Sequence, residues 1–269
     1  MILTYKNIML PKELRPKGLF NLIRLGRDND GGYLICKNSV ENSNCLISFG
    51  IKDDFSFEER FKAMNNSKIH AYDPTVTYKT FLKQIIRSLM GFNLNSFFIN
   101  ILNYFKFKKF FDNKENFFFR KKIGKGGNII YPYISIDDVI KLANNEKNSK
   151  FFFKIDIEGS EYSILDDLVK YSDIISGAAI EFHQCDLHME RIVKFLKNFN
   201  LILVHTHPNN WEVNGINNVP SVLELTFSSN PELISNDVSF PHQLDQKNNP
   251  NVEDVELIFS DNKFFYLTI

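Results

Sequence analysis

The chain has 269 residues, of which 43% are hydrophobic and 24% charged, so it has enough apolar side chains for a sizeable core. Its 32 Lys and Arg residues balance 32 Asp and Glu residues, and this zero net charge argues against a general affinity for nucleic acid. The N-terminus lacks the apolar stretch of a signal peptide, and no run approaches ~20 apolar residues. We therefore expect a cytoplasmic protein without a membrane-spanning segment.

We assign residues 1–269 to a single domain that begins with an N-terminal cap segment, residues 1–44. A strand pattern already occurs within this segment, and strand and helix patterns alternate after it. Residues 33–36 and the apolar run 45–49 are predicted strands. Residues 51–66 are predicted to lead from a loop into a helix, and residues 68–73 to form the next strand. This strand–helix–strand order over about thirty residues predicts a right-handed unit of a parallel sheet.

Residues 76–112 interrupt this alternation. They are rich in aromatic residues and Lys, with apolar residues at mostly helical intervals, and are predicted to form one or two inserted helices. A packed helical cap or a dimer contact is the main expectation, and a lid over a substrate is an alternative. Docking on a membrane surface is a third, because Lys106, Lys108 and Lys109 stand beside aromatic residues.

The alternation resumes after the insertion, with continuous apolar runs of the kind buried on both faces of a parallel sheet. Ser135 is the predicted N-cap of a helix whose first turn carries Asp137 and Asp138. A glycine turn is predicted at residues 124–127. The predicted strands span residues 116–124, 150–159, 176–183, 201–207, 221–227 and 264–269, and the predicted helices span residues 135–146, 160–175 and 189–200.

Polar residues follow four of the predicted strands. Ligands of open α/β sheets bind beyond the carboxyl ends of the strands, so these residues are candidates for one common site. They are Gly50 with Asp54, Asp73, Asp156 with Glu158, and Glu181 with His183.

The turn after residue 49 indicates which cofactor fits. Asp73 closes the second strand, where an acidic side chain accepts hydrogen bonds from ribose hydroxyls in nucleoside-binding folds. Gly50 permits a ligand to approach the backbone closely. The fingerprint G-x-G-x-x-G is absent, and Asp53 and Asp54 would repel a phosphate but tolerate an ammonium and a sulfonium. The turn therefore favours S-adenosylmethionine over a dinucleotide.

A hydroxyl acceptor needs a group that removes its proton, and His183 is the first candidate for this base because histidine titrates near neutrality. Glu181 shares its strand face. A divalent metal that lowers the hydroxyl pKa is the less favoured alternative, because no tight ligand motif is visible. Its candidate ligands are Asp156, Glu158, Glu181, His183 and His207. Glu158 is interpreted as a catalytic residue in the turn, and Glu161 as a residue that stabilises the start of a helix.

Residues 205–211, with the sequence HTHPNNW, combine hydrogen-bonding groups with an aromatic face, a mixture that suits a carbohydrate. The candidate substrate-binding residues here are His207, Asn209, Asn210 and Trp211. The two asparagines are equally typical of an ordinary turn, and that interpretation stays open. Arg27 is predicted to close over the cofactor or over a phosphate of a nucleotide sugar.

Several segments together resemble the FkbM-type S-adenosylmethionine-dependent methyltransferases, in particular those of bacterial polysaccharide and capsule gene clusters. They are LISFGIKDDFSFEERF, HAYDPT, SIDDVI and KIDIEGSEYSIL, with RDNDGGY, EFH, HTHPNNW and PSVLELTF. The resemblance covers most of residues 24–227, apart from the insertion. It implies a class I (Rossmann-like) α/β fold, in which helices cover both faces of a mostly parallel seven-stranded sheet whose last strands are antiparallel.

The resemblance also implies roles for individual residues. Phe49, Gly50 and Asp54 would line the methionine end of the cofactor, Asp73 would hold the ribose, and the turn 124–127 would lie near the adenine. Asp156 and Glu158 would face the methyl-transfer site. The full set of expected cofactor residues is Phe49, Gly50, Asp54, Phe57, Asp73, Pro74, Gly124 and Asp156.

The expected reaction is O-methylation of a sugar or nucleotide sugar, such as a heptose used for a surface glycan, with S-adenosylhomocysteine as the product. A polyketide, lipid or phosphoramidate acceptor is an alternative, as is a nucleoside-binding protein without catalysis. We expect neither a nucleic-acid partner nor integral membrane association, and the formation of a homodimer stays open.

Overall fold

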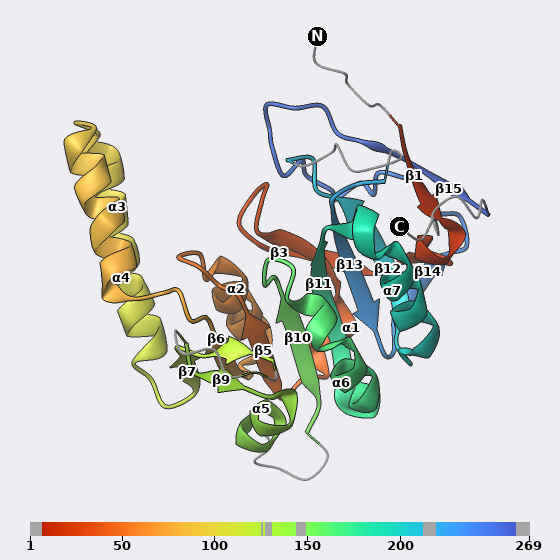
Figure 1. Ribbon diagram of the computed structural model, residues 1–269, viewed down its shortest axis with the longest axis horizontal. Helices are drawn as coiled ribbons and strands as arrows, with labels where there is room; N and C mark the ends of the chain where they lie inside the picture. The colour runs from red at the N-terminus through yellow and green to blue at the C-terminus, as the bar shows by residue number, and fades with distance from the viewer. Residues whose placement is uncertain (1–6, 125, 127–130, 144–148, 212–218, 262–269) are drawn as a thin grey trace.

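The computed structural model describes residues 7–124, 126, 131–143, 149–211 and 219–261. A seven-stranded sheet forms its centre (Figure 1). Its strands are β5 (Cys45–Phe49), β6 (Lys68–Tyr72), β7 (Asn116–Phe119), β10 (Phe151–Ile155), β11 (Ile175–His183), β12 (Ile202–Pro208) and β13 (Val222–Ser228). Their order is β12–β13–β11–β10–β5–β6–β7. The predicted α/β class with a mostly parallel seven-stranded sheet is confirmed.

The direction of the last strands differs from the expectation. β13 is antiparallel to both of its neighbours, β11 and β12, so β12 has the same direction as the parallel strands. The reason is the position of β13, which follows β12 in the chain but lies between β12 and β11 in the sheet. One strand is therefore antiparallel, rather than several.

Helices cover both faces of the sheet. They are α1 (Lys37–Glu41), α2 (Ser56–Asn65), α5 (Ile136–Ala143), α6 (Leu165–Lys170) and α7 (Cys185–Asn198). Because side chains alternate along a strand, Ile47 and Phe153 pack with α5, α6 and α7, whereas Leu46 and Phe152 pack with α1 and α2 on the opposite face. Both faces are dry, which explains the continuous apolar runs in the sequence.

The N-terminal residues form more regular structure than a cap segment of loops would. They contain β1 (Asn7–Pro11), the short helix η1 (Lys12–Leu14), β2 (Leu19–Phe20), β3 (Leu22–Gly26) and β4 (Gly32–Cys36). Leu25, Tyr33 and Ile35 of the β3–β4 hairpin are buried against the sheet beside α2. β1 pairs with β15 (Glu256–Ser260), and β2 pairs with β14 (Leu233–Ser235), so the two ends of the described chain lie together.

Two predicted elements differ in detail, and a third cannot be compared. The predicted strand 116–124 is divided into β7 and β8 (Lys122–Ile123), and β8 pairs with β9 (Tyr133–Ile134) outside the main sheet. The predicted helix 160–175 is broken into η2 (Glu161–Ser163), α6 and η3 (Ser172–Ile174). The predicted strand 264–269 lies outside the described residues. The N-cap at Ser135 is confirmed, because its hydroxyl accepts a hydrogen bond from the amide of Asp138.

The predicted insertion forms a helical hairpin of α3 (Tyr78–Met90) and α4 (Leu94–Phe111). Thr77 caps α3, and the side chain of Asn93 caps α4. The hairpin projects from the β7 edge of the sheet, away from the rest of the molecule (Figure 1). Among the helices that the structure describes, none has the length and hydrophobicity to cross a bilayer.

Candidate active site

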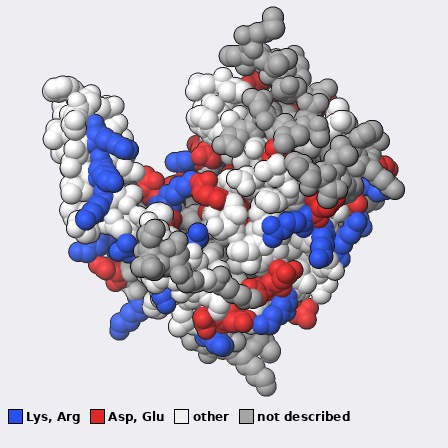
Figure 2. Space-filling model, in the orientation of Figure 1, with Lys and Arg blue, Asp and Glu red and all other residues white. Residues whose placement is uncertain are grey.

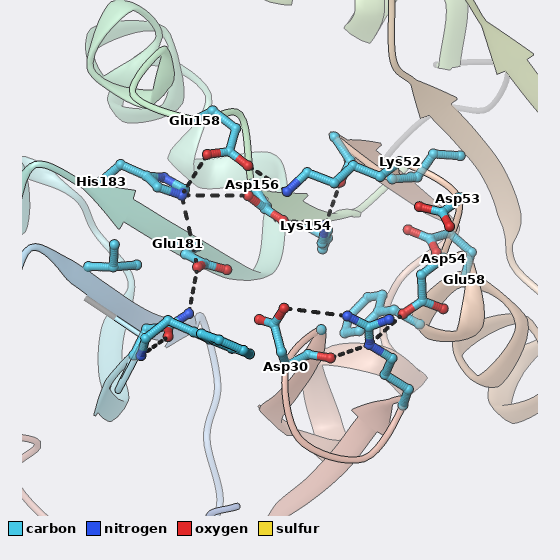
Figure 3. Close-up of a pocket in the computed structure, with 18 residues that line it drawn as sticks. Asp30, Lys52, Asp53, Asp54, Glu58, Lys154, Asp156, Glu158, Glu181 and His183 are labelled. Carbon is cyan, nitrogen blue, oxygen red and sulfur yellow. Dashed lines mark hydrogen bonds and ion pairs between the residues drawn. The ribbon is translucent and has the colours of Figure 1, made fainter. Parts of the chain in front are cut away.

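Two adjoining cavities lie at the carboxyl ends of the parallel strands. The first, which we call the β11 cavity, has a volume of about 220 Å³ and is bounded by residues at the ends of β4, β5, β10 and β11 (Figure 3). The second, the β6 cavity, has a volume of about 260 Å³ and lies beside the end of β6. Both are lined by Gly50, Lys52, Asp156 and Glu158, so these four residues stand between the two cavities.

The loop after β5 is fixed in place by residues of the neighbouring strands. Gly50 has a φ of +76°, and a Cβ atom there would lie 1.7 Å from the carbonyl oxygen of Asp156, so only glycine fits. Lys154 is buried and donates a hydrogen bond of 2.6 Å from Nζ to the carbonyl oxygen of Gly50. The amide of Lys52 donates to Oδ2 of Asp73 at 2.9 Å. The loop is therefore preorganised to receive a ligand.

The β6 cavity combines one buried carboxylate with apolar walls. Asp73 is 3% exposed, and its Oδ1 accepts hydrogen bonds from the amide and the hydroxyl of Thr75 at 2.7 and 2.6 Å. Oδ2 accepts only the amide of Lys52 among the described residues, so it has a further acceptor position. Pro74, Ile123 and the ring of Tyr131 supply apolar surface beside it. This combination suits a nucleoside, with ribose hydroxyls at the carboxylate and the base between apolar walls.

A histidine surrounded by carboxylates forms one wall of the β11 cavity. Nδ1 of His183 lies 2.5 Å from Oε1 of Glu161, a residue with no exposed surface. Nε2 of the same ring lies 3.4 Å from Oε2 of Glu158, and 3.9 Å from both Oδ1 of Asp156 and Oε1 of Glu181. Figure 3 shows Asp156, Glu158 and Glu181 converging on His183, with Lys52 and Lys154 nearby.

This environment changes the protonation of the histidine. Burial disfavours the imidazolium, but the hydrogen bond and charge of Glu161, together with Glu181 and Asp156, outweigh burial and raise the pKa of His183 to about 9. A histidine that already carries its proton at neutral pH cannot accept another. The geometry therefore does not favour His183 as a free general base.

Glu181 is better suited to that role, because it loses its proton at a lower pH than His183 does. Burial, followed by repulsion from Asp156 and Glu224, raises its pKa to about 8. Its two oxygens accept hydrogen bonds from the hydroxyl of Tyr33 at 2.7 Å and from the amide of Asn209 at 3.1 Å. These bonds orient a carboxylate that lines the cavity and titrates close to neutrality.

Asp156, Glu158 and His183 also meet the geometric requirements for a metal ion. Each offers one ligand atom, and the three atoms lie within 4.8 Å of one another. Two carboxylate oxygens and one imidazole nitrogen suit a divalent ion such as Mg²⁺ or Mn²⁺. Glu161 would accept the Nδ1 proton and so direct Nε2 toward the ion, an arrangement common around metal-bound histidines.

His207, another candidate ligand, lies elsewhere. Its Nδ1 is 3.5 Å from Glu224, and its Nε2 is 3.8 Å from Asp254. The sheet order explains this separation, because β13 lies between β12, which carries His207, and β11, which carries His183. The candidates Asp156 and Glu158, in contrast, do lie beside His183.

The mouth of the β11 cavity is formed by side chains from both ends of the chain. Nε of Arg27 lies 3.3 Å from Oδ2 of Asp54, which joins the β3–β4 turn to the loop after β5. On the opposite side, Trp211 leaves 59% of its surface exposed next to Asn209. Figure 2 shows acidic and basic side chains gathered beside the hollow between the hairpin and the rest of the molecule.

Most of the predicted site residues line these cavities. They are Arg27, Gly50, Asp54, Phe57, Asp73, Pro74, Asp156, Glu158, Glu181, His183, Asn209 and Trp211.

Four predicted residues do not line either cavity. Phe49 points into the core, where its ring contacts Tyr72 and Phe153. Gly124 follows the lining residue Ile123, and its amide donates to the carbonyl of Ile134; the rest of that turn lies partly outside the described residues. His207 and Asn210 bind the C-terminal segment, Asn210 through the backbone of Asn249.

Three residues of the site are not among the sequence-based candidates. Lys154 is the one charged residue in the apolar strand FFFKI, and this isolated charge is a signal that sequence reasoning can use. Lys52 and Tyr33 give no comparable signal, because their roles depend on contacts with Asp73 and Glu181, which are distant in the sequence.

The comparison with protein families agrees with this geometry. The sequence profile of the Methyltransferase FkbM domain matches residues 27–245. No curated protein sequence matches the chain.

Solved structures of several methyltransferases resemble the chain at low similarity. A ribosomal RNA methylase from Streptococcus thermophilus has 10% identity and a TM-score of 0.38, over 72% of this chain and 92% of that one. A precorrin-6y C5,15-methyltransferase from Geobacter metallireducens has 9% identity and a TM-score of 0.34, over 71% and 82%. The structure of WbdD has 12% identity and a TM-score of 0.37, over 75% and 38%.

The family match covers more than half of the sequence and both cavities, and the mostly parallel seven-stranded sheet agrees with the class I fold that the resemblance implied. The chain therefore belongs to the FkbM family of methyltransferases.

Proposed function

We propose that the protein transfers a methyl group from S-adenosylmethionine to a hydroxyl group of a sugar, and most directly of a nucleotide-activated sugar. The observation that carries this proposal is the junction of the two cavities at Gly50, Lys52, Asp156 and Glu158. A nucleoside in the β6 cavity would direct its sulfonium toward this junction, where an acceptor in the β11 cavity can meet it.

The β6 cavity would hold the adenosine part of the cofactor. Asp73 has an acceptor position for a ribose hydroxyl, and carboxylates bind paired hydroxyls strongly. Asp53 and Asp54, on the loop between the cavities, favour the ammonium and sulfonium charges of the cofactor and oppose a pyrophosphate.

The β11 cavity has features that suit a sugar. Trp211 offers an exposed ring for stacking, and Arg27 at the mouth offers a cation for an acceptor phosphate. Asn209 donates one amide hydrogen to Glu181, which leaves its second amide hydrogen for an acceptor hydroxyl. Its carbonyl oxygen also accepts the amide of Trp211, so the asparagine supports the position of the aromatic ring.

In the chemical step, the acceptor oxygen forms a bond to the methyl carbon while the carbon–sulfur bond breaks, and S-adenosylhomocysteine leaves. The acceptor loses its hydroxyl proton to the carboxylate of Glu181, whose raised pKa makes it a suitable base. A divalent ion held by Asp156, Glu158 and His183 would lower the pKa of that hydroxyl. The main contribution of the chain is alignment of the two reactants.

The test uses S-adenosylmethionine with a labelled methyl group and a set of acceptors that contains nucleotide sugars, free sugars, lipids and a polyketide. We expect label in the nucleotide sugars, lost on treatment with EDTA and restored by Mg²⁺ or Mn²⁺. Transfer of the label to a lipid or a polyketide, and to no sugar, would show that the proposed acceptor class is wrong. Binding of S-adenosylhomocysteine without transfer to any acceptor would favour the nucleoside-binding alternative.

Glu181→Gln is the matched variant for the proposed base, because glutamine retains the size of the side chain and an oxygen that can accept from Asn209, while its amide nitrogen can donate to the hydroxyl oxygen of Tyr33. We expect turnover to fall by ~10²–10⁴-fold, the usual contribution of a general base. S-adenosylhomocysteine should still bind with little change. Unaltered turnover would exclude Glu181 as the base.

A further inference from the structure

The α3–α4 hairpin carries an apolar surface that the rest of the described chain leaves uncovered. Of 23 large hydrophobic side chains that are exposed in the described residues, 11 lie between Tyr78 and Phe105. Helical spacing places these side chains in one row along each helix. The rows are Tyr78, Leu82, Ile86 and Leu89 on α3, and Leu94, Phe98, Leu102 and Phe105 on α4.

The exposed rows are not needed to attach the hairpin to the sheet. Other residues do that: Phe81 packs against Tyr104 and Phe107 at the base of the hairpin, next to Phe118 of β7. At the other end, Phe92 in the turn between the helices is 92% exposed. The hairpin thus has an anchored base and an uncovered, apolar tip, and exposed apolar areas of this extent mark interaction sites.

The charge of the hairpin indicates the chemistry of its partner. Residues 78–111 contain no Asp or Glu, whereas the whole chain has equal numbers of acidic and basic residues. Figure 2 shows Lys and Arg side chains in a row along one side of the hairpin, with uncharged surface over its tip. The basic residues of this segment are Lys79, Lys83, Arg87, Lys106, Lys108 and Lys109.

We infer that the hairpin docks the protein onto the surface of an anionic lipid membrane. Apolar side chains at the tip would enter the boundary between headgroups and acyl chains, and the basic residues along the shaft would contact the lipid phosphates. This combination of an apolar face with a purely basic flank is typical of helices that lie on membranes. A second copy of the same hairpin is a poorer partner, because two surfaces with only positive charges repel each other.

The length of the apolar segment agrees with shallow docking. Residues 94–105 of α4 carry no charge, and twelve helical residues extend ~18 Å, well short of the ~30 Å hydrocarbon core of a bilayer. Neither α3 nor α4 has the length and hydrophobicity to cross a bilayer.

Docking would bring the active site to the membrane surface. The side chain of Gln84 on α3 donates a hydrogen bond to Asp53, which lines the β11 cavity. The hairpin is therefore linked to the loop that separates the two cavities. This inference is independent of the proposed methyl acceptor, because it concerns where the protein binds rather than what it methylates.

Co-sedimentation of the full chain with vesicles tests the inference. We expect binding to vesicles of phosphatidylcholine mixed with phosphatidylglycerol, and little binding to phosphatidylcholine alone. Raising the salt from ~0.1 M to ~1 M shortens the Debye length from ~10 to ~3 Å and should weaken binding. Absence of binding to either vesicle overturns the inference.

Two variants separate the apolar and the basic contributions. The double variant Phe98→Ser with Leu102→Ser should weaken binding at least ~tenfold, because it removes two apolar side chains that would otherwise pass from water into the membrane. Lys83→Gln with Arg87→Gln should weaken binding to anionic vesicles and reduce its dependence on salt. The control is Leu187→Ser with Lys194→Gln on α7, which alters equally exposed residues outside the hairpin and should leave binding unchanged.

Phe92→Asn provides a variant that preserves the fold, because Phe92 has a φ of +52°, which asparagine adopts more readily. It should weaken vesicle binding without lowering the melting temperature. Light scattering after gel filtration is run on the same proteins. If these hairpin variants convert a dimer into a monomer and leave vesicle binding unchanged, the surface is a contact between copies and the inference is wrong.

Discussion

At the scale of single residues, the sequence locates the candidate catalytic groups but not their partners. His183 and Glu181 could be predicted, because polar residues at the end of a buried strand face the ligand side of an α/β sheet. Glu161 was expected to stabilise a helix, yet it is buried and holds Nδ1 of His183. Its role depends on the turn at Glu158, which has a φ of +52°, and a backbone conformation of that kind at a glutamate is not readable from sequence.

Glu161→Gln tests the supporting role of this residue. Glutamine retains the size of the side chain but removes the negative charge that favours a metal-bound histidine. We expect the affinity for Mn²⁺, measured by calorimetry, to fall by ~10–100-fold. Glu190→Gln, at an exposed position of α7, is the control and should not change it. Equal affinities in all three proteins would contradict a metal site that depends on Glu161.

The pH dependence of metal binding follows from the raised pKa of His183. Below about 9 the imidazole carries a proton in the metal-free protein, and that proton must leave before Nε2 can bind an ion. Affinity for Mn²⁺ should therefore rise as the pH rises from 6.5 toward 9, by up to ~tenfold per unit. Calorimetry in buffers of different ionisation enthalpy should also show proton release. A flat profile without proton release would show that the histidine is not a ligand.

At the scale of secondary structure elements, the strands were the most predictable part. Buried runs such as FFFKI identify parallel strands regardless of tertiary contacts, because both of their faces must be apolar. The predicted helix 160–175 was less accurate, since its residues follow a helical pattern yet form two short 3-10 turns around α6. The first of these turns carries Glu161 to His183, so a tertiary contact overrides the local pattern.

The loop after β5 can be tested by a pair of glycine substitutions. Gly50→Ala would place a Cβ atom 1.7 Å from the Asp156 carbonyl in a backbone with positive φ. Gly159→Ala has the same backbone cost, with a φ of +91°, but no atom within 4 Å of the new Cβ. We expect Gly159→Ala to lower the free energy of unfolding by ~1–2 kcal/mol, and Gly50→Ala to lower it by more and to abolish S-adenosylhomocysteine binding. Equal losses of stability in the two variants would refute the close approach at Gly50.

At the scale of the whole molecule, the sequence predicts the class of fold but not how the C-terminal segment packs against the sheet. Two contacts hold the C-terminal segment against β12: Nε2 of His205 lies 2.9 Å from Asp245, and Nε2 of His207 lies 3.8 Å from Asp254. From the sequence alone, His207 is predicted only to bind a metal or the substrate. Contacts between residues forty or more positions apart have no local sequence pattern, so the sequence does not predict them.

The pH dependence of stability tests the contact between His207 and the C-terminal segment. Burial lowers the pKa of His207, but the neighbouring carboxylates of Asp254 and Glu224 outweigh burial and raise it to about 10. Because the pKa is ~6.5 in the unfolded chain, the stabilisation is complete below pH ~6.5 and is lost as the pH rises toward 10. We expect the free energy of unfolding to fall by ~1.4 kcal/mol per pH unit in this window from this group. In His207→Gln this dependence of the free energy of unfolding on pH should be absent. Urea denaturation at several pH values measures it, and an identical dependence in the native protein and in the variant would contradict the assignment.

The central claim is that the β6 cavity binds the nucleoside part of S-adenosylmethionine, and calorimetry with S-adenosylhomocysteine tests it most directly. We predict one bound molecule per chain in the native protein, no detectable binding of NAD, and much weaker binding of S-adenosylhomocysteine to Asp73→Asn, whose side chain loses the charge that favours the ribose hydroxyls. Absence of S-adenosylhomocysteine binding, or equal binding to the native protein and to Asp73→Asn, would contradict the account.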